Sequence, residues 1–374
     1  MFNLPKLLTF PIALKLLTVI EITAYILAGL VPYVDSLTNP IIIILGILFP
    51  FLACSLILTA IIWLFANKRW SLLCFIIFFI GWKSIISNFA FNFPEKQHRN
   101  NYDPTITIIS YNVHQFKPSI GDWENGIDRF IKTLIYKNAD ILCLQEFNNS
   151  QKPGYMAYNN LNTIKTALRM QSSYFSRDYQ YYDSLVAEGT AIFTKFPVLD
   201  SGKIMLNSSP PCPSVIYLDL LIGADTLRIM NTHLESFGLS QNHDSRSRYP
   251  ENKRRAKILP FPRQLSRKIV DIILIQNQQA TELSDIVKSS PYPVILCGDL
   301  NSTPNTLAYN KIKGNLQDAF IQAGFGMEPT YWDYFPKLRI DYIFVDPTFK
   351  ISSFETGKER ISDHYPIQAK IILR

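Results

Sequence analysis

The sequence predicts a mixed α/β domain preceded by three transmembrane helices. Three observations lead to this expectation. The amino-terminal part contains three long apolar runs, and from Thr105 onward short β-rich runs alternate with amphipathic stretches. Several predicted strands also end in a polar residue of a type that binds metal ions or handles protons. With 374 residues, 48% of them hydrophobic, the chain is long enough for one large domain and an additional segment.

The three apolar runs occupy residues 11–33, 41–65 and 70–91. Each has the length that an α-helix needs to cross a bilayer core of about 30 Å. A cleavable signal peptide would give one shorter run. We therefore expect residues 1–91 to form a three-helix anchor, which would make this an integral protein of the inner or cytoplasmic membrane.

The positive charges near these runs predict an orientation. Lys6 and Lys15 precede or open the first run, Lys68 and Arg69 separate the second from the third, and the loop 32–40 has neither residue type. Because Lys and Arg are enriched on the cytoplasmic side, the amino terminus and the Lys68–Arg69 loop should be cytoplasmic. The carboxy-terminal domain should then lie outside.

Two charged residues, Glu21 and Lys83, fall within the predicted spans. A charge near the middle of a membrane is costly unless it is paired, and the two are expected at similar depth, so one hypothesis is an interhelical ion pair. The alternative is that each side chain reaches the interface or is held by separate backbone groups. A further reading, in which the spans form a small transporter, depends on these two charges alone.

A polar stretch at 92–104, bounded by prolines, should tether the soluble domain of residues 105–374 close to the membrane surface. The turn at 223–225 predicts an antiparallel hairpin, and residues 128–138 between two strands predict a crossover helix, so the sheet should be mixed. Strands are expected at 105–111, 140–146, 190–195, 215–222, 226–232, 293–298, 340–345 and 366–373.

Six short segments combine an apolar strand with a polar ending. They are Ile109–Asn112, Leu142–Glu146, Asn231–Leu234, Gly298–Asn301, Arg339–Tyr342 and Ser362–His364. A parallel-rich sheet presents catalytic groups where its strands end, so six such endings can converge on one hydrolytic site.

The chemistry of phosphodiester hydrolysis accounts for several of these residues. It needs a divalent metal, an activated water and donors for the developing charge. Glu146 is a hard oxygen ligand of the type that Mg²⁺ or Mn²⁺ prefers, although a lone strand-end Glu is more often a surface residue. Asp363 and His364 can position and deprotonate a water, and Asp299 and Asn301 project to one side of the chain. Seen alone, Asp299 and Asn301 fit an Asx turn equally well.

In this order and with these flanks, the six segments resemble the endonuclease/exonuclease/phosphatase superfamily over about residues 104–374. This family has the deoxyribonuclease-I-like fold and includes nucleases, inositol phosphatases and neutral sphingomyelinases. The resemblance implies a four-layer sandwich, with two mixed β-sheets flanked by helices, and a Mg²⁺ or Mn²⁺ cofactor.

The resemblance also implies the metal ligands. Glu146 would be the principal ligand, with Asn112 beside it and Asp363 close to the metal. His114 shares the strand face of Asn112 and either reaches the site or has no role there. The segment 189–197 matches a family strand near the site, but as bare sequence it is a core strand.

The catalytic roles that the resemblance implies fall on five residues. Asp299 would align or activate the attacking water, and Asn301 would bind the phosphate or orient a neighbour. His233 would donate to a phosphoryl oxygen. Asp341 would support His364, which would act as general base or as a donor to the transition state.

We therefore expect a metal-dependent phosphoesterase, most simply a phosphodiesterase, at the outer face of the membrane. The basic segment 241–270 has nine Lys or Arg against two acidic residues, a local excess of +7. It suits nucleic acid or anionic headgroups, or is a solvated loop. The anchor suits a phospholipid or sphingolipid substrate equally well. The alternative from another class is a non-catalytic envelope protein that uses the same fold for binding or scaffolding.

Overall fold

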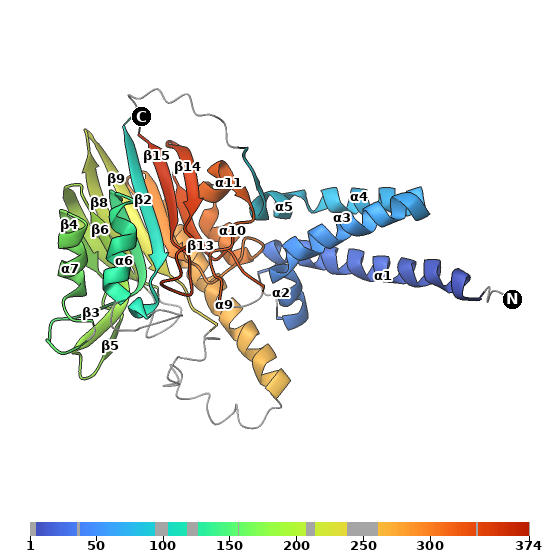
Figure 1. Ribbon diagram of the computed structural model, residues 1–374, viewed down its shortest axis with the longest axis horizontal. Coiled ribbons are helices and arrows are strands. Elements are labelled where there is room, and N and C mark those ends of the chain that lie inside the picture. Colours follow the sequence, from blue (N-terminus) through green and yellow to red (C-terminus); the bar gives the residue numbers. More distant parts are fainter. Residues whose placement is uncertain are drawn as a thin grey trace.

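The computed structural model describes residues 5–35, 38–93, 104–117, 126–155, 157–206, 214–237, 261–333 and 336–373. Two β-sheets pack face to face, helices cover their outer faces, and a bundle of apolar helices projects from one end (Figure 1). Most of the basic segment 241–270 and of the predicted linker 92–104 lies outside the described residues.

The first sheet has the strand order β14-β15-β2-β3-β6-β4, with β5 paired to β6. Its strands are β2 (Thr105–Asn112), β3 (Ile141–Ser150), β4 (Ser172–Phe175), β5 (Tyr179–Tyr181), β6 (Val186–Thr194), β14 (Lys350–Thr356) and β15 (Ile367–Ile372). The second sheet has the order β11-β13-β10-β9-β8-β7. Its strands are β7 (Val198–Met205), β8 (Ser214–Ile222), β9 (Asp225–His233), β10 (Val294–Asp299), β11 (Gln317–Asp318) and β13 (Asp341–Val345).

Both sheets are mixed. The pairs β2–β3 and β9–β10 are parallel, and the other strand pairs in the two sheets are antiparallel. This confirms the predicted mixed sheets, in which antiparallel pairs outnumber parallel ones. Each sheet nevertheless has one parallel pair, and α6 (Gly126–Ile135) provides the predicted crossover between β2 and β3.

Alternating side chains build three cores and so define four layers. Isoleucines of β2, such as Ile106 and Ile108, face residues of β9 and β10 such as Ile229 and Ile295 between the two sheets. The opposite face of the first sheet packs on α6 and α7 (Asn160–Ala167). The opposite face of the second packs on α9 (Phe261–Lys288) and α10 (Leu307–Lys313). The predicted four-layer α/β sandwich is confirmed.

All eight predicted strands are present, with ends within a few residues of those expected. The predicted hairpin joins β8 to β9. The strands that the sequence did not predict include the edge strands β7, β14 and β4. These strands are largely exposed or only partly buried, so they lack the alternation of apolar and polar residues that marks a strand in sequence.

The amino-terminal helices correct the prediction of three spans. Two straight helices, α1 (Pro5–Leu30) and α3 (Phe49–Ala66), contain segments long and apolar enough to cross a membrane. The third predicted span is α4 (Lys68–Ile80) and α5 (Trp82–Asn88), which meet at an angle of 66° and make a third span only if the bent pair counts as one. Residues 41–47 of the second predicted span belong to a separate short helix, α2 (Pro40–Ile47).

The bend between α4 and α5 explains why the proposed ion pair is not formed. A Cβ atom at Gly81 would lie 2.1 Å from the Tyr25 hydroxyl, which donates a 2.8 Å hydrogen bond to the Phe78 carbonyl at the break. Lys83 lies beyond this bend and is exposed. Glu21 instead accepts a hydrogen bond from the Ser55 hydroxyl of α3, and no ion pair among the described residues joins it to Lys83.

The helices are docked directly on the sandwich. Asn305, which is fully buried, donates hydrogen bonds to the carbonyls of Ala28 and Gly46 at 2.9 and 3.2 Å. Arg339 donates at 2.7 Å to the Ser87 carbonyl of α5. The short strand β1 (Ala90–Phe91) pairs with β12 (Phe325–Gly326) of the sandwich. The amino-terminal helices thus make polar contacts with the sandwich directly, besides their covalent connection through the predicted linker, whose boundaries stay a prediction.

Candidate active site

The site lies at the edge where the parallel pairs of both sheets end. On β10, Ile295 and Cys297 face the core between the sheets, and the same face continues to Asp299. Asp299 is paired with His233 of β9 and with Asp341 of β13. Because β13 runs antiparallel to β10, its first residue meets the last residue of β10. The inward-facing rows thus change from apolar to catalytic residue types at one edge.

A β-bulge directs Glu146 toward this edge. The sequence places Glu146 at the end of a strand, but β3 continues to Ser150, and the pairing of β3 with β6 shifts between Leu144 and Phe147. Glu146 adopts a φ of 50°, an uncommon conformation for a residue other than glycine. Bulges of this kind re-aim side chains next to active sites. The carboxylate lines the pocket instead of continuing the core face.

Asn112 joins the two halves of the site. Its Nδ2 atom donates to Glu146 Oε1 at 3.2 Å and to Asp299 Oδ2 at 3.0 Å. Its Oδ1 atom accepts from the backbone amide of His114 at 3.0 Å. In this arrangement the Asn112 amide orients two carboxylates, one from each sheet, while its oxygen is occupied by the backbone.

Asp299 and Asn301 form the Asx turn that the sequence allowed, and they also belong to the site. The backbone amide of Asn301 donates to Asp299 Oδ1 at 2.8 Å, and Asn301 has a φ of 48°. The Asn301 Nδ2 atom donates to the Leu234 carbonyl and lies 3.0 Å from His233 Nε2. His233 Nε2 is 3.6 Å from Asp299 Oδ2, so the three side chains lie together.

Asp341 and His364 form a buried dyad. Nδ1 of His364 lies 2.8 Å from Asp341 Oδ2, and its Nε2 lies 3.6 Å from Asp299 Oδ2. Burial alone lowers the pKa of His364, but the charges of Asp341 and Asp299 and the hydrogen bond to Asp341 raise it well above its usual range. The tilted ring of Tyr331, 4.9 Å between centroids, packs on the imidazole. The raised pKa of His364 favours its protonated form, and its Nε2 atom faces Asp299 Oδ2.

Asp299 is shifted in a way that suits proton transfer. Burial, followed by the charge of Asp341, raises its pKa to about 6, against the opposing effects of His364, His233 and the Asn112 hydrogen bond. The carboxyl group is 1% exposed. A carboxylate with a pKa near neutrality is a better proton acceptor than an ordinary aspartate.

His114 lies between two carboxylates on the pocket wall. Its Nδ1 atom is 3.3 Å from Glu146 Oε2 and 3.7 Å from Asp363 Oδ2. Burial lowers the pKa of His114, but the hydrogen bond to Glu146 and the charges of Glu146 and Asp363 outweigh it, and the net pKa is raised. His114 does not continue the strand of Asn112, as the sequence predicted, but lies past its end in the turn η2 (His114–Phe116) with a φ of 44°; from there it reaches the site, which the sequence left open.

Two sets of side chains could hold a metal ion. The ligand atoms of Asp299, Asp341 and His364 lie within 4.8 Å of one another, but the ring nitrogen nearest Asp341 is already used in the dyad. Glu146 and Asp363 fit a hard cation better. Both carboxylates come within 3.7 Å of the same nitrogen of His114, so they converge on one point, and both line the pocket. Oxygen donors of this kind suit Mg²⁺ or Mn²⁺.

A buried polar network supports the site from below, which the sequence did not predict. Gln145 Nε2 donates to Ser110 Oγ at 3.1 Å and to Asn231 Oδ1 at 2.7 Å. Asn231 Nδ2 donates to the carbonyls of Leu144 and Ala191 across the sheets. The polar residues that flank the motifs thus fix the separation of the two sheets. Their signal in sequence was a polar residue at an inward-facing position of a strand.

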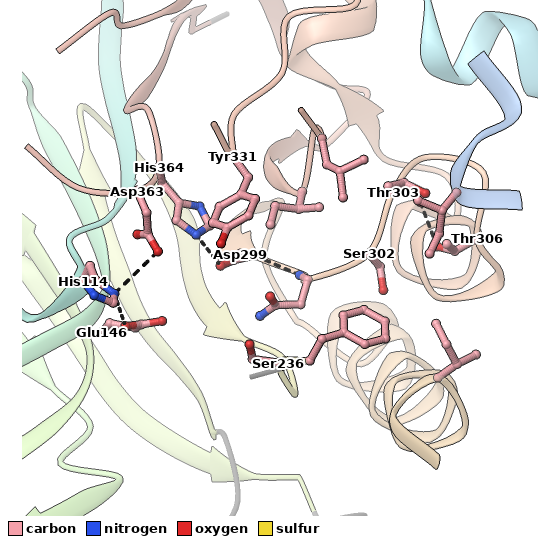
Figure 2. A pocket seen from close by; sticks show the side chains of 16 residues that line it. His114, Glu146, Ser236, Asp299, Ser302, Thr303, Thr306, Tyr331, Asp363 and His364 are labelled. Atoms are coloured by element: carbon pink, nitrogen blue, oxygen red, sulfur yellow. Dashed lines mark hydrogen bonds and ion pairs between the residues drawn. The ribbon is translucent and has the colours of Figure 1, made fainter. Parts of the chain in front are cut away.

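One pocket contains most of these side chains. Figure 2 shows His114, Glu146, Asp363 and His364 on one side of it, with Ser302, Thr303 and Thr306 on the other. The eight predicted residues form one connected set through the contacts above and through His114. They are Asn112, Glu146, His233, Asp299, Asn301, Asp341, Asp363 and His364.

A model of the Endonuclease/Exonuclease/phosphatase family matches residues 109–364, which is more than half of the chain. The chain belongs to this family, whose members are hydrolases that act on phosphoester bonds. A second model, of a domain of unknown function, matches residues 8–88. No curated protein matches the chain.

Solved structures show the same fold at low identity. An endonuclease/exonuclease/phosphatase from Beutenbergia cavernae DSM 12333 is 16% identical, with a TM-score of 0.52 over 72% of this chain and 72% of that one. A family protein from Leptotrichia buccalis C-1013-b is 16% identical, with a TM-score of 0.51 over 72% and 100%. D. rerio TDP2, solved with a single-strand DNA product, is 17% identical, with a TM-score of 0.50 over 72% and 100%.

Proposed function

We propose that this protein is a metal-dependent phosphodiesterase anchored in a membrane, with its catalytic domain on the extracytoplasmic side. The observation that carries the proposal is the convergence of carboxylates and imidazoles from both sheets on one pocket. Two groups there have pKa values displaced in useful directions. Asp299 is a carboxyl with a pKa of about 6, and His364 is an imidazole whose pKa is raised.

Glu146 and Asp363 would hold the metal ion, with Asn112 orienting the Glu146 carboxylate. When bound, Mg²⁺ or Mn²⁺ supplies positive charge to a phosphoryl oxygen and to the transition state. The two carboxylates are only slightly exposed, at 13% and 10% of their side-chain surface, so a cation between them also relieves their mutual repulsion.

Asp299 would accept the proton of the attacking water. Its Oδ1 atom is fixed by the Asn301 amide, while Oδ2 faces His364 and His233. The reacting water would therefore be positioned by a carboxylate that cannot rotate away. The Asn301 side chain and His233 are adjacent and would bind the phosphate oxygens.

His364 would act as a donor and not as the base. Because Asp341 stabilises the imidazolium, the Nε2 proton is available to an oxygen on which negative charge develops. This assignment chooses between the two roles that the family resemblance left open for His364, and it leaves Asp299 as the proton acceptor.

The arrangement of the helices supports the proposed location. The amino terminus of α1 lies at the end of the bundle that points away from the sandwich, and the α3–α4 bundle extends in the same direction (Figure 1). The predicted cytoplasmic charges Lys68 and Arg69 open α4 at the turn from α3. Positive residues at the end far from the domain favour a cytoplasmic position for that end.

The test is an assay of the detergent-purified full chain with Mg²⁺, Mn²⁺ or EDTA. The panel contains plasmid DNA, RNA, sphingomyelin, phosphatidyl lipids and inositol phosphates. We expect metal-dependent hydrolysis of one class, and a loss of about 10³-fold or more in Glu146→Gln. Glu355→Gln, an exposed position on β14, is the matched control. A folded protein that neither binds Mg²⁺ nor turns over any substrate would contradict the proposal and favour a scaffolding role.

A further inference from the structure

The pocket that contains the catalytic side chains is completed by a residue of the amino-terminal helices. Ile47, the last residue of α2, lines it together with residues of the sandwich. The preceding residue, Gly46, accepts a hydrogen bond from Asn305, which lies between Thr303 and Thr306. Figure 2 shows Thr303 and Thr306 across the pocket from Glu146 and His114. The end of α2 is therefore part of the wall that faces the metal-binding side.

The pocket has an apolar part beside its catalytic part. The side chains that form the apolar part come from α2, α9 and two loops, and they are Ile47, Phe237, Ile273, Leu338 and Ile340. A phosphate group and its metal ion are charged and would not occupy this apolar part, because apolar walls bind apolar groups. The substrate that fits the whole pocket is therefore an ester with an apolar substituent.

If the helices span a membrane as proposed, α2 would place this pocket at the level of the membrane surface. It consists almost entirely of apolar residues, and two of them, Ile41 and Ile44, are 67% and 41% exposed. The helix lies between η1 (Val31–Tyr33) and the start of α3, at the end of the bundle that meets the sandwich. An apolar helix exposed at this level is covered when it lies at the boundary of headgroups and acyl chains.

Among the described residues, the pocket lining has no row of positive charges of the kind that follows a nucleic acid strand. Neither this pocket nor the adjoining one, which shares Glu146 and Ser236 with it, is lined by a Lys or Arg among the described residues. The adjoining pocket is lined by Glu188 and Glu235 and by Asp178, whose carboxylate pairs with Lys203 at 2.8 Å. Proteins that hold a nucleic acid strand follow its phosphates with a positively charged groove.

We propose that α2 is part of the substrate-binding site and that the substrate is a membrane amphiphile with a phosphodiester head and an apolar tail. The phosphodiester lies at Glu146 and Asp299, and the tail passes Ile47 toward the bilayer. Water adds to phosphorus as one P–O ester bond breaks, and the leaving alcohol takes up a proton. This inference rests on the proposed function, since it names the substrate class of the same site.

The test compares three reporter diesters that share one leaving group, p-nitrophenol. The other substituent is ethyl, hexadecyl or thymidine, and each is offered to the full chain in the same detergent micelles with Mg²⁺. We expect kcat/KM for the hexadecyl ester to exceed that for the ethyl ester by at least about 10-fold, as a tail of many methylenes allows. In Ile47→Asp this ratio should fall by about 10-fold, and in Ile135→Asp, at an exposed position of α6 outside the pocket, it should not change.

The ratio compares two substrates on one preparation, so partial misfolding of a variant does not alter it. Three results would overturn the inference and leave the proposed function intact. They are equal rates on the ethyl and hexadecyl esters, a preference for the thymidine ester, and the same ratio in Ile47→Asp as in the parent. Failure to hydrolyse any of the three with Mg²⁺ would instead count against the proposed function, and the inference would fall with it.

Discussion

The buried charge of Asp299 should make the active site costly to stability. The carboxyl is 1% exposed, and burial together with the charge of Asp341 raises its pKa from 3.8 to about 6. Between these pH values the folded protein holds a proton that the unfolded chain has lost. Stability should therefore fall as the pH rises from 3.8 through about 6, and the full penalty should be present above pH 6.

The size of the penalty follows from the shift. One pKa unit corresponds to about 1.4 kcal/mol, so the change from 3.8 to about 6 corresponds to about 3 kcal/mol. Asp299→Asn removes the charge and keeps Oδ1 as the acceptor for the Asn301 amide. It loses the hydrogen bond from Asn112, worth about 1 kcal/mol. The net gain at pH 8 should be about 2 kcal/mol, or roughly 4 °C in the unfolding midpoint of a domain of this size.

The measurement is thermal unfolding of the full chain in detergent with EDTA, followed by tryptophan fluorescence between pH 5 and 8. Asp225→Asn, at the exposed β8–β9 turn, is the control and should leave the midpoint unchanged. The reasoning would be refuted if Asp299→Asn were no more stable than the parent at pH 8. It would also be refuted if its advantage did not shrink toward pH 5, where the parent carboxyl takes up its proton.

Three further outcomes are expected. Asp341→Asn removes the charge that raises the pKa of His364, so the alkaline limb of the pH profile of kcat should move to lower pH. The value of kcat should fall by about 10²-fold or more. An alkaline limb at the same pH as in the parent would contradict the proposed effect of Asp341 on the pKa of His364. Saturating Mg²⁺ should raise the unfolding midpoint of the parent, since a ligand at 100 times its Kd adds about 2.7 kcal/mol to the free energy of unfolding. The Glu146→Gln variant should not show this rise in the midpoint. Asn305→Ala removes the hydrogen bonds to the carbonyls of Ala28 and Gly46, each worth about 0.5–1.5 kcal/mol, so it should lower the midpoint in a denaturation scan; an unchanged midpoint would show that the helices are not held there.

Local patterns were sufficient to predict eight of the strands and the polar residues near their ends. The short apolar runs of β2 and β10 are formed by neighbouring residues, so each run and its polar ending, Asn112 or Asp299, can be recognised without knowing the rest of the fold. The polar residues at the strand ends converge because these strands of both sheets end at the same edge of the sandwich. The roles assigned to these residues stay predictions until the variants are measured.

Features that depend on contacts between residues far apart in the chain could not be predicted from the sequence. The bulge at Glu146 is defined by a register shift against β6, and no residue of β3 alone indicates it. The bend at Gly81 depends on the hydroxyl of Tyr25 from another helix, so three runs of suitable length predicted three straight spans where two are straight. A hydropathy analysis considers only the length and composition of a segment, and neither quantity indicates a contact with another helix at which the segment bends.

The position of α2 is the long-range feature with the greatest consequence for function. Its last residue lines the candidate active-site pocket, and Asn305 of the sandwich holds this region through the carbonyls of Ala28 and Gly46. An unrelated anchor in place of residues 1–91 would leave Asp299 and His364 in place, since their contacts lie within the sandwich. Such a chimera should therefore keep its metal-dependent activity on a short diester and lose its preference for a long apolar substituent. If the preference survived, the apolar part of the pocket contributed by the sandwich alone would be sufficient to bind the tail.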